Sequence, residues 1–433
     1  MSTPLSINDL PEEIMGAVFF EFVEHELEPR HRYQRPEFLV RVCRLWKVWV
    51  EGNPRLWSRI LVEIGWRVTP LDITPIKTRI NLTRGCPLAL DIRIMGGGPT
   101  TITHDVLLLY EIIKEHHWRA LSILHTRWLS PFEIIFRHMI DNPGKCRLTS
   151  FHIGWVKYES NADMIYALVR EALQQNLGIT DLTVPPQLLE PSHPLLHAVP
   201  SLELVEGWYT TTIFGVIREA SRVQRLRVHF RTENLYQLQD TSIPPCLLPC
   251  LKHFELQTCS QFSMLLLQKL DLPNIHSLGL KGVYGDVEQL SKGLKSLVRN
   301  VPWLTRIKSL TLDESYFSEE PLLWTLKRLP LLKDLTLGSW EVTCKTTKAL
   351  SRKSTKRGGW VCPLLEEITF RQCLRLLERD VVALVKARVR DVPQVEPGSM
   401  IEPNLPSPAR LRKVIWRSRD IVQETFSTGN VQI

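Results

Sequence analysis

A short apolar pattern recurs along most of this chain, and it limits what the chain can fold into more than any other feature. In each copy an apolar residue is followed by two variable residues, a second apolar residue, one variable residue and a third apolar residue. Alternation of this kind predicts a short strand with one buried face. Twelve copies occur, and they begin at Ala89, Trp118, Leu148, Ile179, Val199, Val223, Leu251, Ile275, Ile307, Leu332, Leu365 and Leu411. Their mean spacing of about 29 residues indicates a stack of repeated units.

Between the copies lie stretches with apolar residues at three- and four-residue spacing, which predicts helices. Examples are residues 103–117, 162–175, 286–300 and 374–388. One strand and one helix cannot bury their apolar faces alone, so neighbouring units must stack, with parallel strands on the concave side of an arc and helices outside. Two copies also extend to a cysteine, Cys259 and Cys373, as in the longer leucine-rich-repeat pattern. The predicted fold is therefore an irregular leucine-rich-repeat-like α/β solenoid.

Two insertions interrupt this pattern, near residues 343–362 and 389–408. The first contains the basic stretch Ser351–Gly359, for which we expect a loop. The second contains Val392–Pro408 with five prolines, which predicts an irregular loop before the last strand.

The first 60 residues have a different pattern. Asp9 is suited to cap a helix, with Pro11 in its first turn. Ile14, Val18 and Phe22 then follow at intervals of four residues and predict an apolar helical stripe. A second helix is expected over residues 37–51. The two helices carry more apolar surface than so small a module buries alone, which indicates that a partner covers part of it.

These residues resemble a known family. Leu10-Pro11-x-x-Ile14, Val42-Cys43-Arg44-x-Trp46 and Pro54-Arg55-Leu56-Trp57 are similar in order and spacing to the F-box. The similarity is greatest to the F-box proteins abundant in mushroom-forming fungi, which often continue into a stretch like Gly85-Cys86-Pro87-Leu88. The loop before Pro36 is longer and more basic than in compact F-boxes, which puts the details of the docking surface in doubt.

The resemblance implies an adaptor-docking role for the N-terminal module. The residues that would lie in or behind the interface with a Skp-type adaptor are Leu10, Pro11, Ile14, Val42, Cys43, Trp46 and Trp57. We expect an F-box to leave Leu10, Pro11 and Trp57 accessible.

The predicted organisation has three parts: a short all-helical F-box-like module at 1–60, a helical or extended connector at 61–84, and the solenoid at 85–433. The resemblance implies a substrate-recognition subunit of an SCF-type ubiquitin ligase, linked through a Skp-type adaptor to a cullin, with the solenoid binding an unidentified protein substrate. The alternative is a leucine-rich-repeat scaffold without a ubiquitin role, whose N-terminal helices cap the first repeat under a polar outer face.

Polar residues between the apolar positions of the strands are candidates for contact with the substrate, because alternate side chains point to opposite faces of a strand. They are His152, Arg227, His229, Glu255, Lys281 and Arg371.

The sequence contains no complete catalytic or cofactor-binding motif. Gly96-Gly97-Gly98 is not followed by the remainder of a phosphate-binding motif, and Cys246, Cys250, His253 and Cys259 do not have the spacing of a standard zinc site. We therefore expect no enzyme activity, no cofactor and no metal.

Composition limits the location and the partners further. A net charge of +8, from 54 basic and 46 acidic residues, is too balanced for a dedicated nucleic-acid binder. The first residues have no secretory pattern, and no apolar run is long enough to cross a membrane. The nine cysteines are scattered. These features predict a protein of the cytoplasm, the nucleus or both.

Overall fold

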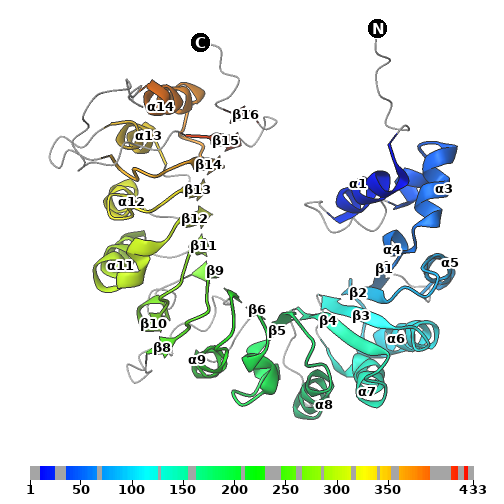
Figure 1. Cartoon of the computed structure of the whole chain (residues 1–433). Coiled ribbons are helices and arrows are strands. Elements are labelled where there is room, and N and C mark those ends of the chain that lie inside the picture. The colour runs from blue at the N-terminus through cyan, green and yellow to red at the C-terminus, as the bar shows by residue number, and fades with distance from the viewer. Residues whose placement is uncertain are drawn as a thin grey trace, which may run out of the picture. The chain divides into compact units, whose positions relative to one another are not determined.

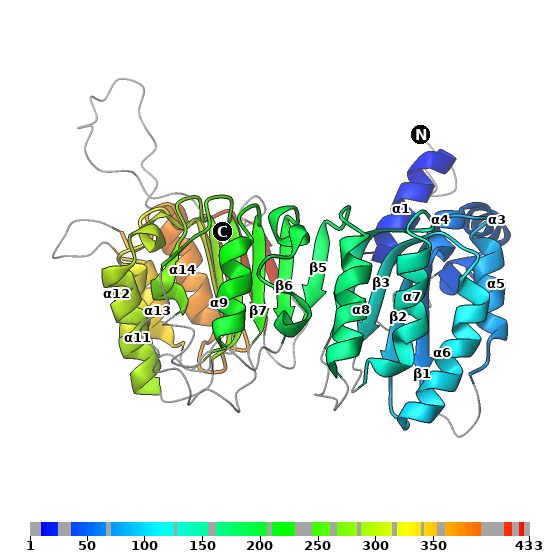
Figure 2. The ribbon, with the colours of Figure 1, turned by 90° about the horizontal axis from the view of Figure 1, so that it is seen from below.

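In the computed structural model the described residues are 10–24, 36–65, 71–124, 128–154, 162–205, 210–229, 245–259, 266–283, 287–313, 318–338, 342–352, 360–390, 411–417 and 424–427. The chain divides into two compact units, residues 1–199 and 200–433. In each unit the helices lie along one face of a sheet and leave the other face without helices (Figures 1 and 2). We call the latter the helix-free face of that unit.

Unit 1 begins with helices and continues into five parallel strands. The strands are β1 (Arg59–Ile64), β2 (Leu88–Ile94), β3 (Trp118–Leu124), β4 (Cys146–Ile153) and β5 (Asp181–Val184), and they pair in this order. The helices are α1 (Glu12–Glu24), α3 (Arg44–Gly52), α4 (Pro54–Trp57), α5 (Thr74–Leu82), α6 (Pro99–Ile113), α7 (Glu133–Asp141) and α8 (Ala162–Gln174). Short 3₁₀ helices are η2 (Ser130–Phe132), η3 (Pro186–Leu188) and η4 (Pro194–His197).

Unit 2 has a longer row of parallel strands. They are β6 (Ser201–Val205), β7 (Arg225–His229), β9 (His253–Cys259), β11 (Ser277–Val283), β12 (Ser309–Asp313), β13 (Asp334–Gly338), β14 (Glu367–Arg371) and β15 (Lys413–Arg417), followed by antiparallel β16 (Glu424–Ser427). β8 (Cys246–Leu247) and β10 (Leu270–Asp271) form a separate small sheet. The helices are α9 (Thr210–Glu219), α11 (Val287–Asn300), α12 (Glu319–Leu326), α13 (Cys344–Leu350), α14 (Glu378–Arg390) and the 3₁₀ helix η6 (Pro302–Arg306).

All twelve copies of the apolar pattern lie at parallel strands of these sheets, so the solenoid-like α/β prediction is confirmed. The first apolar residue of every copy is buried. The position of the first copy was predicted wrongly. We began it at Ala89, which puts its second and third apolar residues at Ile92 and Ile94, but Leu90 and Ile92 are the residues that pair with Leu121 and Ile123 of the next copy. Leu88, Leu90, Ile92 and Ile94 alternate along the whole of β2, so the apolar pattern fits equally well two residues earlier or later.

The strand array begins earlier than the predicted solenoid. β1 lies where we expected the end of the helical module and the start of a connector, and it pairs with β2 over its whole length. Trp57 at the end of α4 and Ile60 and Val62 of β1 fit the same apolar pattern. We had assigned Trp57 to the docking motif and so did not recognise this copy.

The expected second helix is divided. Residues 36–40 are helical, and α3 starts only after Cys43, whose sulfur accepts a hydrogen bond from the backbone N–H of Trp46 at 3.5 Å. A side chain that accepts a bond from an N–H in the first turn starts a new helix, which explains the break. Helices α6, α8, α11 and α14 lie where the periodicity predicts them.

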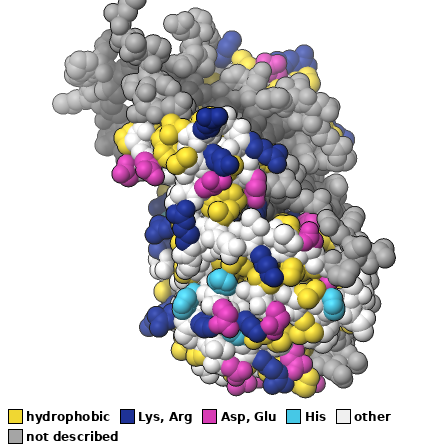
Figure 3. Space-filling view, turned by 90° about the vertical axis from the view of Figure 1, so that its right-hand side faces the viewer, with side chains coloured by type: hydrophobic (Ala, Val, Ile, Leu, Met, Phe, Trp, Pro, Cys, Tyr) yellow, Lys and Arg dark blue, Asp and Glu magenta, His cyan; other side chains and the backbone are white. Residues whose placement is uncertain are grey.

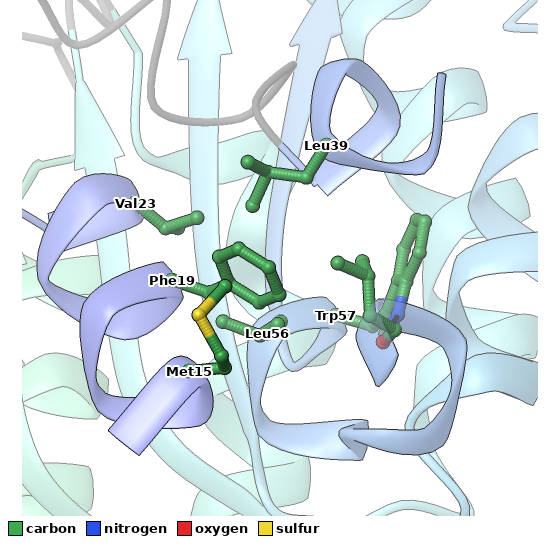
Figure 4. Close-up of a cluster of buried hydrophobic side chains, with 7 residues drawn as sticks. Met15, Phe19, Val23, Leu39, Leu56 and Trp57 are labelled. Carbon is green, nitrogen blue, oxygen red and sulfur yellow. Dashed lines mark hydrogen bonds between the residues drawn. The ribbon is translucent and has the colours of Figure 1, made fainter. Parts of the chain in front are cut away.

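The N-terminal helices share a core with the first repeat. Met15, Phe19 and Val23 of α1 pack with Leu39, Val50, Leu56 and Trp57, and Leu82 of α5 packs against this group (Figure 4). Apolar burial, the dominant favourable term in folding, therefore holds α1, α3, α4 and α5 together next to β1.

A buried arginine links two segments in the C-terminal part of unit 2. Arg388 of α14 is fully buried and donates hydrogen bonds to the carbonyl oxygens of Leu350 at 2.8 Å, Val361 at 2.6 Å and Cys362 at 3.3 Å. Its guanidinium also lies 4.8 Å from the ring centroid of Trp360. Burial lowers the pKa of Arg388 to about 10, so the group is charged at neutral pH. A single side chain thus joins three backbone positions from two segments.

Within the predicted insertion at 343–362, residues Cys344–Leu350 form helix α13. Residues 353–359 of the basic stretch, and all of the predicted loop at 392–408, lie outside the described residues.

Candidate functional site

Helix α1 carries two apolar stripes side by side. Met15 and Phe19 lie on the stripe that faces the core and are buried. Ile14 and Val18 lie on the neighbouring stripe, and Ile14 is 50% exposed. Residues four apart lie on one face of a helix, so each stripe is continuous along α1. The predicted stripe is therefore present, but it faces solvent in the isolated chain.

Residues 38–48 of the same module also carry exposed apolar side chains. Val42 is 59% exposed, Val48 is 66% exposed, and Phe38 and Leu45 are also exposed. Figure 3 shows hydrophobic side chains at the surface of the part formed by the N-terminal helices. We call Ile14, Val18, Phe38, Val42, Leu45 and Val48 the apolar surface of the module. A group of this kind on a small module is typical of a site that a partner covers.

The residues predicted to serve adaptor docking do not all share this surface. Pro11, Ile14, Val42 and Cys43 are exposed, Leu10 and Trp46 are half-buried, and Trp57 is buried. Trp46 lies against Phe19, with ring centroids 4.9 Å apart.

The expectation that Trp57 is accessible is wrong. Its side chain is 5% exposed, and its indole N–H donates a hydrogen bond to the carbonyl oxygen of Val50 at 2.8 Å. The physical reason is its place as the first apolar residue of the β1 copy, a position that is buried throughout the array. Trp57 therefore supports the module from behind.

A second group of polar residues lies on the helix-free face of unit 2. Glu203 of β6, Arg227 of β7 and Glu255 of β9 are direct neighbours in register. Arg227 lies 3.7 Å from a carboxylate oxygen of each glutamate. His229 Nε2 lies 2.8 Å from Glu203, and Lys281 Nζ lies 2.9 Å from Glu255. Charges alternate along this row, so it is neutralised within the chain.

The electrostatics of Glu255 agree with this pairing. Burial by itself raises the pKa of the Glu255 carboxyl, but hydrogen bonds from Lys281 and Gln257 and the charge of Arg227 outweigh it and leave the pKa below its ordinary value. The carboxylate is thus ionised and held by its neighbours.

Another ion pair crosses a whole strand. Arg371 of β14 donates to the carboxylate of Asp313 of β12 at 3.0 Å, although β13 lies between these strands. Gly338 of β13 makes this possible: a Cβ atom there would lie 1.8 Å from Asp313 Oδ1. The absence of a side chain leaves room for the carboxylate to reach across.

All six residues predicted for the substrate face lie on helix-free faces. Arg227, His229, Glu255 and Lys281 meet in one network, Arg371 pairs with Asp313, and His152 lies on β4 of unit 1 opposite Ser122 and Thr183. Sequence reasoning missed Glu203, Asp313 and Gly338. Glu203 was detectable, because it occupies the same place in its copy as Arg227 and Glu255 do in theirs.

The described residues do not form an obvious reactive centre. Burial raises the pKa of the Cys146 thiol to about 12, that of Cys246 to about 11 and that of Cys362 to about 12, so these thiols stay protonated. Among the described residues no three His, Cys, Asp or Glu side chains gather as they would around a metal ion. The same part of the chain contains no helix long and apolar enough to cross a membrane.

Comparisons with known proteins add little to this description. No protein-family model matches the chain, and no curated protein matches it. Among solved structures it is similar to one described as the crystal structure of the Rad7 and Elc1 complex in yeast, with 14% sequence identity and a TM-score of 0.34 over 85% of this chain and 90% of that chain. At this score the similarity carries no argument about function.

Proposed function

We propose that the chain is the substrate-recognition subunit of an SCF-type (Skp–cullin–F-box) E3 ubiquitin ligase. In this proposal the N-terminal module docks on a Skp-type adaptor, and through it on a cullin, while the repeats hold a protein substrate. The chain does no bond chemistry itself. It contributes proximity, because a tethered substrate lysine has a high effective concentration near the activated ubiquitin.

The apolar surface of the module is the observation that carries the proposal. Val42 belongs both to this surface and to the residues that resemble the F-box. A module that only capped the first repeat would present a polar outer face. Instead, Ile14, Val42 and Val48 are at least half exposed, and such a surface is stabilised when a partner removes it from water.

Co-expression of the full chain with a Skp-type adaptor, followed by size-exclusion chromatography, tests this role. We expect an equimolar complex with the wild type. Val42→Glu combined with Val48→Glu should abolish it, because two charges then occupy an apolar interface. Both side chains are exposed, so the module itself should remain folded.

Met164→Glu combined with Leu177→Glu is the matched control. These two apolar side chains of unit 1 are exposed to a similar degree and lie outside the module, and the change in net charge is the same. The control should retain the complex. A wild-type chain that elutes alone and soluble would contradict the proposal and favour a free-standing repeat scaffold.

A further inference from the structure

The residues that precede the strands of unit 2 form a continuous row. In each copy this is the second residue of the apolar pattern. The carbonyl oxygen of Lys252 accepts hydrogen bonds from the N–H groups of His276 at 2.8 Å and Ser277 at 3.0 Å. The carbonyl oxygen of His276 accepts in the same way from Lys308 at 2.8 Å and Ser309 at 2.9 Å. This ladder places Lys252, His276 and Lys308 one strand apart along one edge of the sheet.

Charge is divided along this edge. We call Arg225, Lys252, His253, His276 and Lys308 the basic edge; they belong to β7, β9, β11 and β12 or directly precede these strands. Within the described part of the chain no carboxylate forms a salt bridge with any of them. The side-chain ammonium of Lys252 donates a hydrogen bond to the amide oxygen of Gln224, at 3.4 Å.

Carboxylates gather at the starts of the next two strands, beside Lys333. Asp334, Glu366 and Glu367 stand at the starts of β13 and β14, and we call them the acidic edge. Glu366 is paired there with Lys333 at 2.9 Å and Arg412 at 3.4 Å. The positive charges of this part are therefore compensated inside the chain, in contrast to those of the basic edge.

The pKa values of two side chains agree with this separation of charge. Burial, followed by the positive charges of His276, Arg225 and Lys252, lowers the pKa of His253. Burial, followed by the negative charges of Glu367 and Glu366, raises the pKa of Asp334 although Lys333 opposes the shift. Each group lies in a field of its own sign, which a partner of the opposite sign would relieve.

The central row of the same face differs from the basic edge. Arg227 and Lys281 are already bound to Glu203 and Glu255. A partner that used them would first have to break these pairs, whereas Lys252 and Lys308 are exposed and have no such partner among the described residues.

We propose that the basic edge of unit 2 is the docking surface for an acidic segment of a protein partner, a proposal that rests on the function proposed above for the repeats. Neighbouring strands lie about 4.8 Å apart, so the four strands of this edge span about 14 Å. That is the length of about four or five residues of extended chain. The occupant is therefore a short run rich in Asp and Glu that lies across the strands.

The test uses the full chain, purified with its adaptor when the complex forms, and a fluorescein-labelled peptide of alternating Glu and Gly. A peptide of the same length with Gln in place of Glu is the reference. Fluorescence anisotropy should show binding of the Glu peptide that weakens as salt is added, because exposed charges are screened. Lys252→Glu combined with Lys308→Glu should weaken it by about tenfold or more.

Lys327→Glu combined with Lys345→Glu is the matched control, because these exposed lysines lie on the helix side of unit 2 and the net charge changes equally. It should keep the wild-type affinity. Equal loss in both variants, or binding of the Gln peptide as tight as that of the Glu peptide, overturns the inference. Because the variants keep the N-terminal module, adaptor binding measured on the same samples separates a failure of this inference from a failure of the docking proposal.

Discussion

The N-terminal module and the helix-free face of unit 2 differ in the kind of side chain that they expose. The module has more apolar side chain than it buries, and Val42 and Val48 remain largely in water. The helix-free face has many charges, and Arg227, Glu255 and Lys281 neutralise one another. The first surface therefore leaves apolar side chains in contact with water, whereas most charges of the second surface are paired within the chain.

This difference indicates which residues of the repeats are available to bind a partner. Paired charges on a strand face are polar and exposed, and so they resemble a binding surface in the sequence. Exposed ion pairs contribute little to stability, but they occupy the groups that a partner would need. Only where pairing fails, as along the basic edge, does the fold leave charge for another molecule.

The largest expected effect tests the two stripes of α1 against each other. Phe19→Ala should cost about 3–5 kcal/mol of the stability of the module, because a buried aromatic side chain leaves a cavity. Val18→Ala, one residue away on the exposed stripe, should change it by less than about 0.5 kcal/mol. Hydrogen exchange of the α1 amides measures both. Similar protection in the two variants would show that the stripes are not distinct.

An intermediate effect is expected at the ion pair that crosses β13. Gly338→Ala should cost about 1–3 kcal/mol, because the new methyl group occupies the space of the Asp313 carboxylate. In the background of Asp313→Ala the same substitution should cost clearly less. Urea unfolding of the four proteins gives the coupling energy. If the two costs simply add, the carboxylate does not depend on the missing side chain.

The smallest effect compares two aspartates on neighbouring strands. Asp334→Asn should stabilise the chain slightly at neutral pH, because the raised pKa of Asp334 means that its ionised form is disfavoured in the folded state. The gain should disappear as the pH falls through the pKa of Asp334 and the carboxyl becomes protonated. Asp313→Asn should instead destabilise, because it weakens the pair with Arg371. Thermal unfolding across pH measures the difference, and a shift of the same sign in both variants would contradict it.

The repeat was predictable because its signal is local. Each copy except the last buries three residues at a fixed spacing, and one pattern therefore found twelve strands. The start of the copy in β2 was not predictable, because four apolar residues alternate along this strand and the pattern fits at two places. The role of Trp57 was misjudged because one residue satisfied two patterns, and burial in the β1 copy decides its exposure.

The site was less predictable, for a different reason. The alternation of strand residues predicts that Arg227 and Arg371 face away from the helices, but not that Glu203 and Asp313 neutralise them. Such pairs depend on the register between strands some 25 to 60 residues apart, as the separation of Asp313 from Arg371 illustrates. Register is a property of the stack and not of a single copy.

The contacts of Arg388 have a consequence for changes in chain length. The Arg388 side chain joins the end of α13 to the segment that begins at Trp360 through its own hydrogen bonds and its contact with the Trp360 ring. We therefore expect a change in chain length between positions 352 and 360 to leave these three hydrogen bonds of Arg388 in place.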